Sequence, residues 1–158
     1  MATERYRLGG VVERRESASP WLDRLWQPVG VLASVPDLPA WTLLGEEEGR
    51  ARFYAGPCEL ELHRTDTTTY RDNLATGAPR IWIACRVQPG EDRPAVVTIT
   101  ADPAEGEALT EAGDDIVEQV PMPPEIAAVL AEFVAAHHVE RPFIKRRRDG
   151  ARPLEDEE

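Results

Sequence analysis

Two adjacent histidines and a basic run near the C-terminus are the side chains with the clearest capacity for chemistry. His137 and His138 precede a segment in which five of the eight residues from Arg141 to Arg148 are basic. Imidazole nitrogens are common zinc ligands, but neighbouring residues of a helix point about 100° apart, so these two are poorly placed to share one metal ion. His63 is the only other histidine, and no cysteine cluster supports it. We therefore expect no bound metal and no cofactor.

The basic run has two interpretations. It is followed within a few residues by EDEE, and alternating basic and acidic blocks at a terminus are typical of a solvated tail. Guanidinium and ammonium groups also bind carboxylates and phosphates, so the run is a candidate contact for an acidic or phosphate-bearing partner. Little aromatic surface surrounds it beyond Phe143, which disfavours RNA binding. The candidate partner-binding residues here are His138, Arg141, Lys145, Arg146, Arg147 and Arg148.

A tryptophan-rich segment, SPWLDRLWQPVGVL, precedes one of the expected strands. Its two rings, Trp21 and Trp26, flank Arg24. Packing in the core explains the rings most simply, but tryptophan beside arginine is also the composition of energetic hot spots in protein interfaces. Trp21, Arg24 and Trp26 therefore form a second set of candidate partner-binding residues.

Local motifs for catalysis are lacking. The sequence has no GxSxG elbow, no P-loop and no GxGxxG. Asp114 and Asp115 adjoin a glycine and are interpreted as solvated turn residues. Cys58 and Cys85 are too far apart for a CxxC pair and are expected to be buried in strands. We expect no catalytic residues.

Composition narrows the class of protein. The 158 residues suit one domain, and 42% hydrophobic and 30% charged residues fit a globular fold. The formal net charge of −11 argues against nucleic acid and anionic membranes as partners. The first residues lack the apolar stretch of a signal peptide, and no apolar run is long enough to span a bilayer. We expect a cytoplasmic protein.

The expected elements position these residues as follows. Strands are predicted over 6–15, VGVLASV, 41–44, 51–54, CELELHR, IWIACRV and AVVTIT, with a turn at Pro89 and Gly90. Helices are predicted in TDTTTYRDNL, capped by Asp66, in DPAEGEALTEAG, and over 124–138. VPMPP is interpreted as a rigid connector. The prediction is a single α+β domain over 1–144, an antiparallel sheet with a short middle helix and a packed C-terminal helix, followed by a charged tail over 145–158.

Several motifs in fixed order resemble the bacterial DUF3305 family of unknown function. They are VVERRE, SPWLDRLWQPVGVL, ARFYAGPCELELHRTDTTTYRDNL, DDIVEQVPMPP and HHVERPFIKRRR, and the resemblance covers nearly all of residues 8–148. Members of this family are found near genes for molybdenum-dependent formate dehydrogenase and its assembly chaperones. The resemblance therefore implies a non-catalytic accessory or assembly protein, with formate dehydrogenase or one of its chaperones as protein partner.

Two other functions remain open. Some members of the family carry the label molybdopterin-guanine dinucleotide biosynthesis protein A, which implies a small binder or enzyme acting on that nucleotide. The nearest match here to a phosphate-cradling loop is RLGGVVERRE, in which Val11 and Val12 favour strand and the expected lysine is missing. The third possibility is a structural subunit of the mature dehydrogenase complex.

Overall fold

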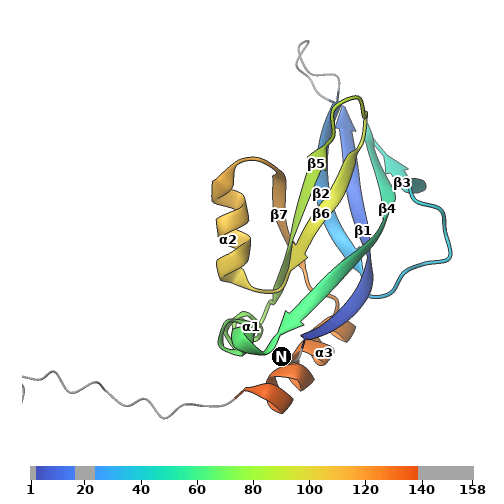
Figure 1. Cartoon of the computed structure of the whole chain (residues 1–158). Coiled ribbons are helices and arrows are strands. Elements are labelled where there is room, and N and C mark those ends of the chain that lie inside the picture. The colour runs from blue at the N-terminus through green and yellow to red at the C-terminus, as the bar shows by residue number, and fades with distance from the viewer. Residues whose placement is uncertain (1–2, 17–23, 139–158) are drawn as a thin grey trace, which may run out of the picture.

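The computed structural model describes residues 3–16 and 24–138, and within them the chain forms seven strands and three α-helices (Figure 1). The strands are β1 (Thr3–Glu16), β2 (Arg24–Leu32), β3 (Thr42–Glu47), β4 (Arg50–His63), β5 (Arg80–Val87), β6 (Pro94–Thr100) and β7 (Ile116–Pro121). The helices are α1 (Thr67–Ala75), which follows a 3-10 turn over Arg64–Asp66, α2 (Pro103–Ala112) and α3 (Pro124–His137).

The strands form two antiparallel sheets where the sequence led us to expect one. The first has the order β2-β1-β4-β3 and the second the order β6-β5-β7. The sheets approach one another along two seams, with β7 beside β2 and β6 beside β4. The α+β class is confirmed. β3 takes no part in either seam and lies on the right of Figure 1.

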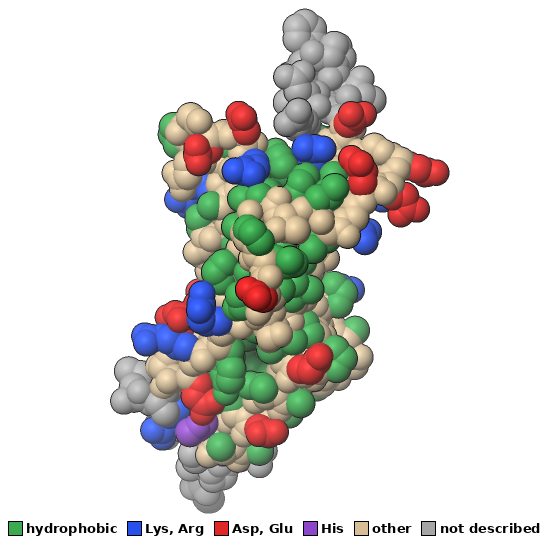
Figure 2. Space-filling model, turned by 90° about the vertical axis from the view of Figure 1, so that its right-hand side faces the viewer, with side chains coloured by type: hydrophobic (Ala, Val, Ile, Leu, Met, Phe, Trp, Pro, Cys, Tyr) green, Lys and Arg blue, Asp and Glu red, His purple; other side chains and the backbone are tan. Residues whose placement is uncertain are grey.

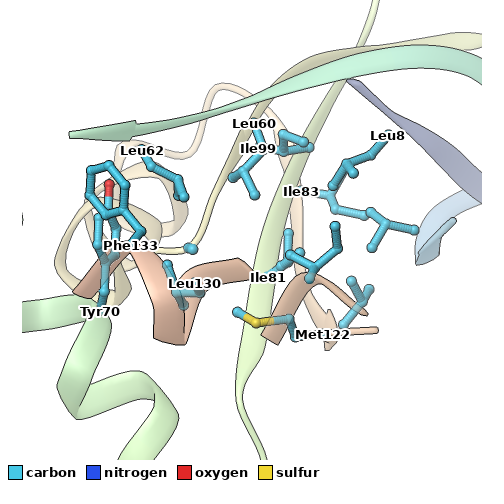
Figure 3. Close-up of a cluster of buried hydrophobic side chains, with 14 of the residues drawn as sticks. Leu8, Leu60, Leu62, Tyr70, Ile81, Ile83, Ile99, Met122, Leu130 and Phe133 are labelled. Carbon is cyan, nitrogen blue, oxygen red and sulfur yellow. The ribbon is translucent and has the colours of Figure 1, made fainter. Parts of the chain in front are cut away.

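The core lies between the two sheets (Figure 3). Alternation in CELELHR is confirmed, because Leu60 and Leu62 are fully buried while Glu59 is exposed. From the other sheet Ile81 and Ile83 are fully buried as well. The remaining labelled members of the core in Figure 3 are Leu8, Tyr70, Ile99, Met122, Leu130 and Phe133.

The predicted boundary between 51–54 and CELELHR is wrong, because both segments belong to the single strand β4. The chain passes Gly56 with φ 109°, a conformation that glycine adopts without a steric penalty, and the ladder with β1 shifts register at this point. The β-bulge lets one long strand continue where glycine and proline in the sequence indicate an end.

The ends of α2 follow the expected local signals, whereas the cap predicted for α1 is not made. The side chain of Asp102 accepts a hydrogen bond from the Ala104 amide, Pro103 occupies the first turn of α2, and Gly113 closes the helix with φ 76°. Asp66 stands at the N-cap position of α1, but its side chain makes no capping hydrogen bond. The last helix was expected to end at His138 and ends at His137.

α1 and α3 lie at one end of the sheets, and α2 lies beside β5 and β7 (Figure 1). Phe133 of α3 lies against Tyr70 of α1 with ring centroids 6.1 Å apart, and both side chains are buried. Asn73 of α1 fixes the start of β5: its amide donates to the carbonyls of Arg80 and Ala101, and its Oδ1 accepts from the Arg80 amide. The expected boundary at residue 144 and the tail over 145–158 lie outside the described residues.

Candidate partner-binding surface

Three aromatic rings meet at the end of the sheets away from the helices. Trp26 of β2 lies 5.5 Å from Trp41 and 6.0 Å from Phe53 of β4, and the Trp41 and Phe53 centroids are 5.8 Å apart. We call Trp26, Trp41 and Phe53 the aromatic cluster. All three rings pack against the core yet stay only partly buried. Edge-to-face and tilted aromatic contacts of this kind contribute roughly 0.5–1.5 kcal/mol each beyond their burial.

Strand register and one unusual backbone conformation bring these rings together. Arg14 of β1 pairs with Trp26 across the ladder and Val12 pairs with Phe53, so alternate residues of β1 place both rings on one face. Trp41 comes from the segment before β3, and it has φ 72°, which is rare for a side chain of that size. Its amide donates to the Tyr54 carbonyl, which ties this turn to β4.

Two guanidinium groups lie over the cluster. The Arg14 guanidinium is 5.2 Å from the Phe53 centroid, and that of Arg93, from the β5–β6 connection, is 4.7 Å from the Trp41 centroid. Both distances suit cation–π attraction. Arg14, Trp26 and Phe53 line an open pocket of about 380 Å³ with residues 90–93.

Exposed large apolar side chains also lie on the segment before β3 and on β3 itself, where Leu43 pairs with Phe53 of the cluster. These side chains are exposed by 36% to 50% of their accessible area, and Leu43 is the most exposed. We call this set the β3 surface: Val35, Leu38, Leu43 and Leu44. Figure 2 looks at the side of the molecule that carries β3 and shows hydrophobic side chains gathered over its middle, between charged groups above and below. Apolar side chains exposed on one side of a protein and bordered by charged groups are typical of interaction sites.

The structure separates the two predicted sets of partner-binding residues. Trp26 joins the aromatic cluster, whereas His138 lies at the helical end, where its Nδ1 is 3.0 Å from Thr67 Oγ1 and its Nε2 is 3.2 Å from an Arg71 nitrogen. Arg24 belongs to β2 and pairs with Glu16 across the ladder. Trp21, Arg141, Lys145, Arg146, Arg147 and Arg148 lie outside the described residues.

The histidines and cysteines occupy separate places. His137 Nε2 is 3.6 Å from a Glu4 carboxylate oxygen, and His63 Nε2 is 3.5 Å from Glu61. Burial raises the pKa of Cys58 to about 11 and that of Cys85, with a smaller effect of nearby groups, to about 12, so both are neutral thiols at pH 7. In residues 3–16 and 24–138 no three histidine, cysteine or acidic side chains are arranged to hold a metal ion.

Asp115 is not the solvated turn residue that was predicted. Its side chain is only 8% exposed, and its Oδ1 accepts a hydrogen bond from Arg86 Nε at 2.6 Å. This bond raises the pKa of the Arg86 guanidinium. The pair joins β5 to the start of β7, a strand that the sequence pattern did not reveal.

Sequence reasoning missed most of the candidate surface. Trp41 and Leu43 were expected only as parts of a strand, and Arg93 was not singled out. The available signal was the apolar content of VPDLPAWTLL, in which hydrophobic side chains continue through a proline-containing segment. For the described residues, no helix has both the length and the apolar character needed to cross a membrane.

Comparison with known protein families identifies this chain's family. The family described as "Protein of unknown function (DUF3305)" matches residues 7–147, which is most of the chain. No curated protein and no solved structure matches. The sequence-based resemblance is confirmed, and the chain belongs to the DUF3305 family.

Proposed function

We propose that the protein is a cytoplasmic, non-catalytic accessory protein that acts by protein–protein contact through the β3 surface and the aromatic cluster. The observation that supports this most strongly is the exposure of Leu43, at 50%, beside a half-buried pair of tryptophans. Fully burying a side chain of this size contributes about 1.5–3 kcal/mol, and these four are 36% to 50% exposed, so covering each contributes about half of that or less, to which the adjoining rings add.

Arg14 and Arg93 determine which polar groups a partner would place at the rim of that contact. Arg14 and Arg93 sit at the edge of an apolar centre, and an interface of this composition pairs buried aromatic groups with acidic or carbonyl groups of the partner at its rim. The proposed partner is a molybdenum-dependent enzyme, foremost formate dehydrogenase, or one of its assembly chaperones. This choice of partner comes from the family resemblance.

The test is a deletion of the gene in a host that makes formate dehydrogenase. An assembly protein predicts lost dehydrogenase activity and lost molybdenum in a dehydrogenase polypeptide that is still made. Tagged protein should copurify with the molybdenum-free dehydrogenase. Normal activity and molybdenum content in the deletion strain would contradict the proposal, and copurification with the active enzyme alone would identify a structural subunit instead.

A small binder of the molybdopterin guanine nucleotide is the second candidate, and one observation favours it. The pocket beside Trp26 and Phe53 is lined by Arg14 and Arg93, and guanidinium with aromatic groups suits a phosphate attached to a ring system. Glu91 and Asp92 also line it, and their carboxylates oppose a phosphate. Calorimetry with GTP and magnesium distinguishes the two functions. We expect no micromolar binding, and micromolar affinity lost in Arg93→Ala would rank the nucleotide binder first.

A further inference from the structure

Trp41 occupies a turn position at which tryptophan is rare. The Thr42 amide donates to the Pro39 carbonyl at 3.3 Å, which closes a four-residue β-turn over residues 39–42. Trp41 is the third residue of this turn and has φ 72°, whereas the second residue, Ala40, keeps a negative φ. This combination defines a type II turn, which favours glycine at its third residue because a Cβ is sterically unfavourable at positive φ.

Several contacts fix the turn in this conformation. The Thr42 hydroxyl donates at 2.6 Å to the same carbonyl as the Thr42 amide, and the Trp41 amide donates to a carbonyl of β4. The turn lies against the β-bulge of β4, since a Cβ on Gly56 would be 3.5 Å from that of Ala40. A strained residue persists only where its surroundings determine its conformation, and such residues cluster at functional sites.

The indole that the turn positions is only partly covered. It makes an edge contact with Trp26 and a tilted contact with Phe53, and it stays half-buried between Leu38 and Leu43 of the β3 surface in the sequence. Trp82, by comparison, is 6% exposed and lies against α2. The core therefore holds one tryptophan by ordinary packing, whereas Trp41 is held at a conformational cost beside exposed leucines.

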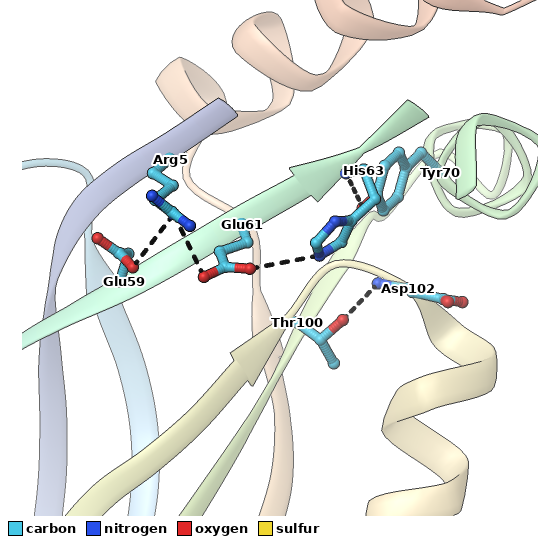
Figure 4. A network of polar contacts seen from close by, with 7 residues as sticks. All are labelled: Arg5, Glu59, Glu61, His63, Tyr70, Thr100 and Asp102. Atoms are coloured by element: carbon cyan, nitrogen blue, oxygen red, sulfur yellow. Dashed lines mark hydrogen bonds and ion pairs between the residues drawn. The ribbon is translucent and has the colours of Figure 1, made fainter. Parts of the chain in front are cut away.

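The guanidinium beside this indole has no carboxylate partner within the described residues. Arg93 lies 4.7 Å from the Trp41 centroid and forms no ion pair there, although two acidic residues precede it in the chain. The Arg5 guanidinium, by contrast, pairs with Glu59 at 3.8 Å and with Glu61 at 3.4 Å (Figure 4). A group that covers the Trp41 indole can therefore also reach an unpaired cation.

We propose that Trp41 anchors the partner contact, and that the turn over residues 39–42 holds the indole for this contact and not for folding. This role of Trp41 rests on the function proposed above. The partner covers the open part of the indole with an apolar side chain and places an acidic group against Arg93. Tryptophan and arginine are enriched among the few residues that carry most of the affinity of an interface, and Leu43 and Leu44 exclude water around them.

Thermal unfolding of the full chain tests whether the fold needs the indole. Trp41→Gly removes the ring and relaxes the turn, so we expect it to melt within about 4 °C of the wild type and above Trp41→Ala, which keeps a Cβ at positive φ. Trp82→Ala is the control and should melt about 10 °C or more below the wild type. Melting of Trp41→Gly below Trp41→Ala, or as low as Trp82→Ala, would overturn the assignment.

Calorimetry with purified, molybdenum-free formate dehydrogenase tests the contact itself. We expect Trp41→Gly to bind about tenfold more weakly or worse, and Arg93→Ala to lose a smaller part of the affinity. Arg5→Ala changes an exposed guanidinium outside the β3 surface and should bind like the wild type. Wild-type affinity in a folded Trp41→Gly protein would overturn the role of Trp41 and leave the proposed partner in place. No binding by the wild type would contradict the proposed partner instead, and the order of melting temperatures would then decide the role of Trp41.

Discussion

Apolar side chains are buried at one end of the molecule and exposed at the other. At the helical end, α1 and α3 close over the sheets, and Leu130 and Phe133 are exposed by 2% or less. At the β3 end, Leu43 and Leu44 are exposed by 50% and 43%. Both ends are rich in hydrophobic residues, so the difference lies in what covers them. Apolar area at the helical end stabilises the fold, and that at the β3 end is available to a partner.

Truncating the helical end should have the largest effect on stability. Phe133→Ala removes a buried ring that contacts Tyr70 and lies 4.6 Å from the ring of His137. We expect the free energy of unfolding to fall by about 3–5 kcal/mol, as for other buried phenylalanines. Thermal or urea unfolding measures this. Glu132→Ala, on an exposed position of the same helix, is the control and should stay within about 0.5 kcal/mol.

Gly106→Ala should have an intermediate effect. A Cβ at this position of α2 would lie 2.2 Å from Cγ of Trp82, so the indole or the helix must move. Alanine favours helix over glycine by about 1 kcal/mol, whereas overpacking costs about 1–3 kcal/mol, so we expect a net loss of stability. Gly30→Ala meets nothing within 4 Å and serves as the control. A Gly106→Ala protein as stable as the wild type would show that α2 is not held against Trp82.

Changing the β3 surface should affect folding much less than Phe133→Ala. Leu43→Asp replaces a side chain that is half exposed, so only about half of its apolar area is lost from the fold. We expect the free energy of unfolding to fall by about 1 kcal/mol. Unfolding in urea checks this. A fall in the free energy of unfolding close to that of Phe133→Ala would mean that the apolar side chains of both ends stabilise the fold.

The smallest effect on stability is expected for deletion of residues 145–158. The sequence there is dominated by charged residues, so little apolar area is lost. We expect the melting temperature to stay the same, while affinity for any acidic or phosphate-bearing partner falls at low salt. The loss should shrink as salt rises, because the contact is electrostatic. A lower melting temperature would show that these residues contribute to the fold.

Local signals in the sequence were enough for most elements. Alternation identified the strand that buries Leu60 and Leu62, and Asp102 and Gly113 marked the ends of α2. β7 was missed because IVEQVP alternates poorly, with only Val120 fully buried, and because it leads into the proline-rich VPMPP. β4 was divided in two because glycine followed by proline usually ends a strand, whereas a bulge lets this one continue.

The candidate site could be predicted only in part. Trp26 was identified from its composition beside arginine, but its partners depend on register and on the positive φ of Trp41, which no local pattern indicates. Exposure of Leu43 follows from the position of β3 beyond the seams between the sheets. Tertiary arrangement therefore decides which apolar residues form the core and which form a surface.

The affinity of purified, molybdenum-free formate dehydrogenase for three forms of the protein tests the central claim most directly. Leu43→Asp places a charge on the β3 surface, and Leu25→Asp places one on a residue of similar exposure, 42%, at the opposite edge of the same sheet. Calorimetry should show binding by the wild type and by Leu25→Asp, and binding weakened by about tenfold or more by Leu43→Asp, because a buried unpaired charge costs more than the lost contact. Equal binding by all three forms would contradict the account.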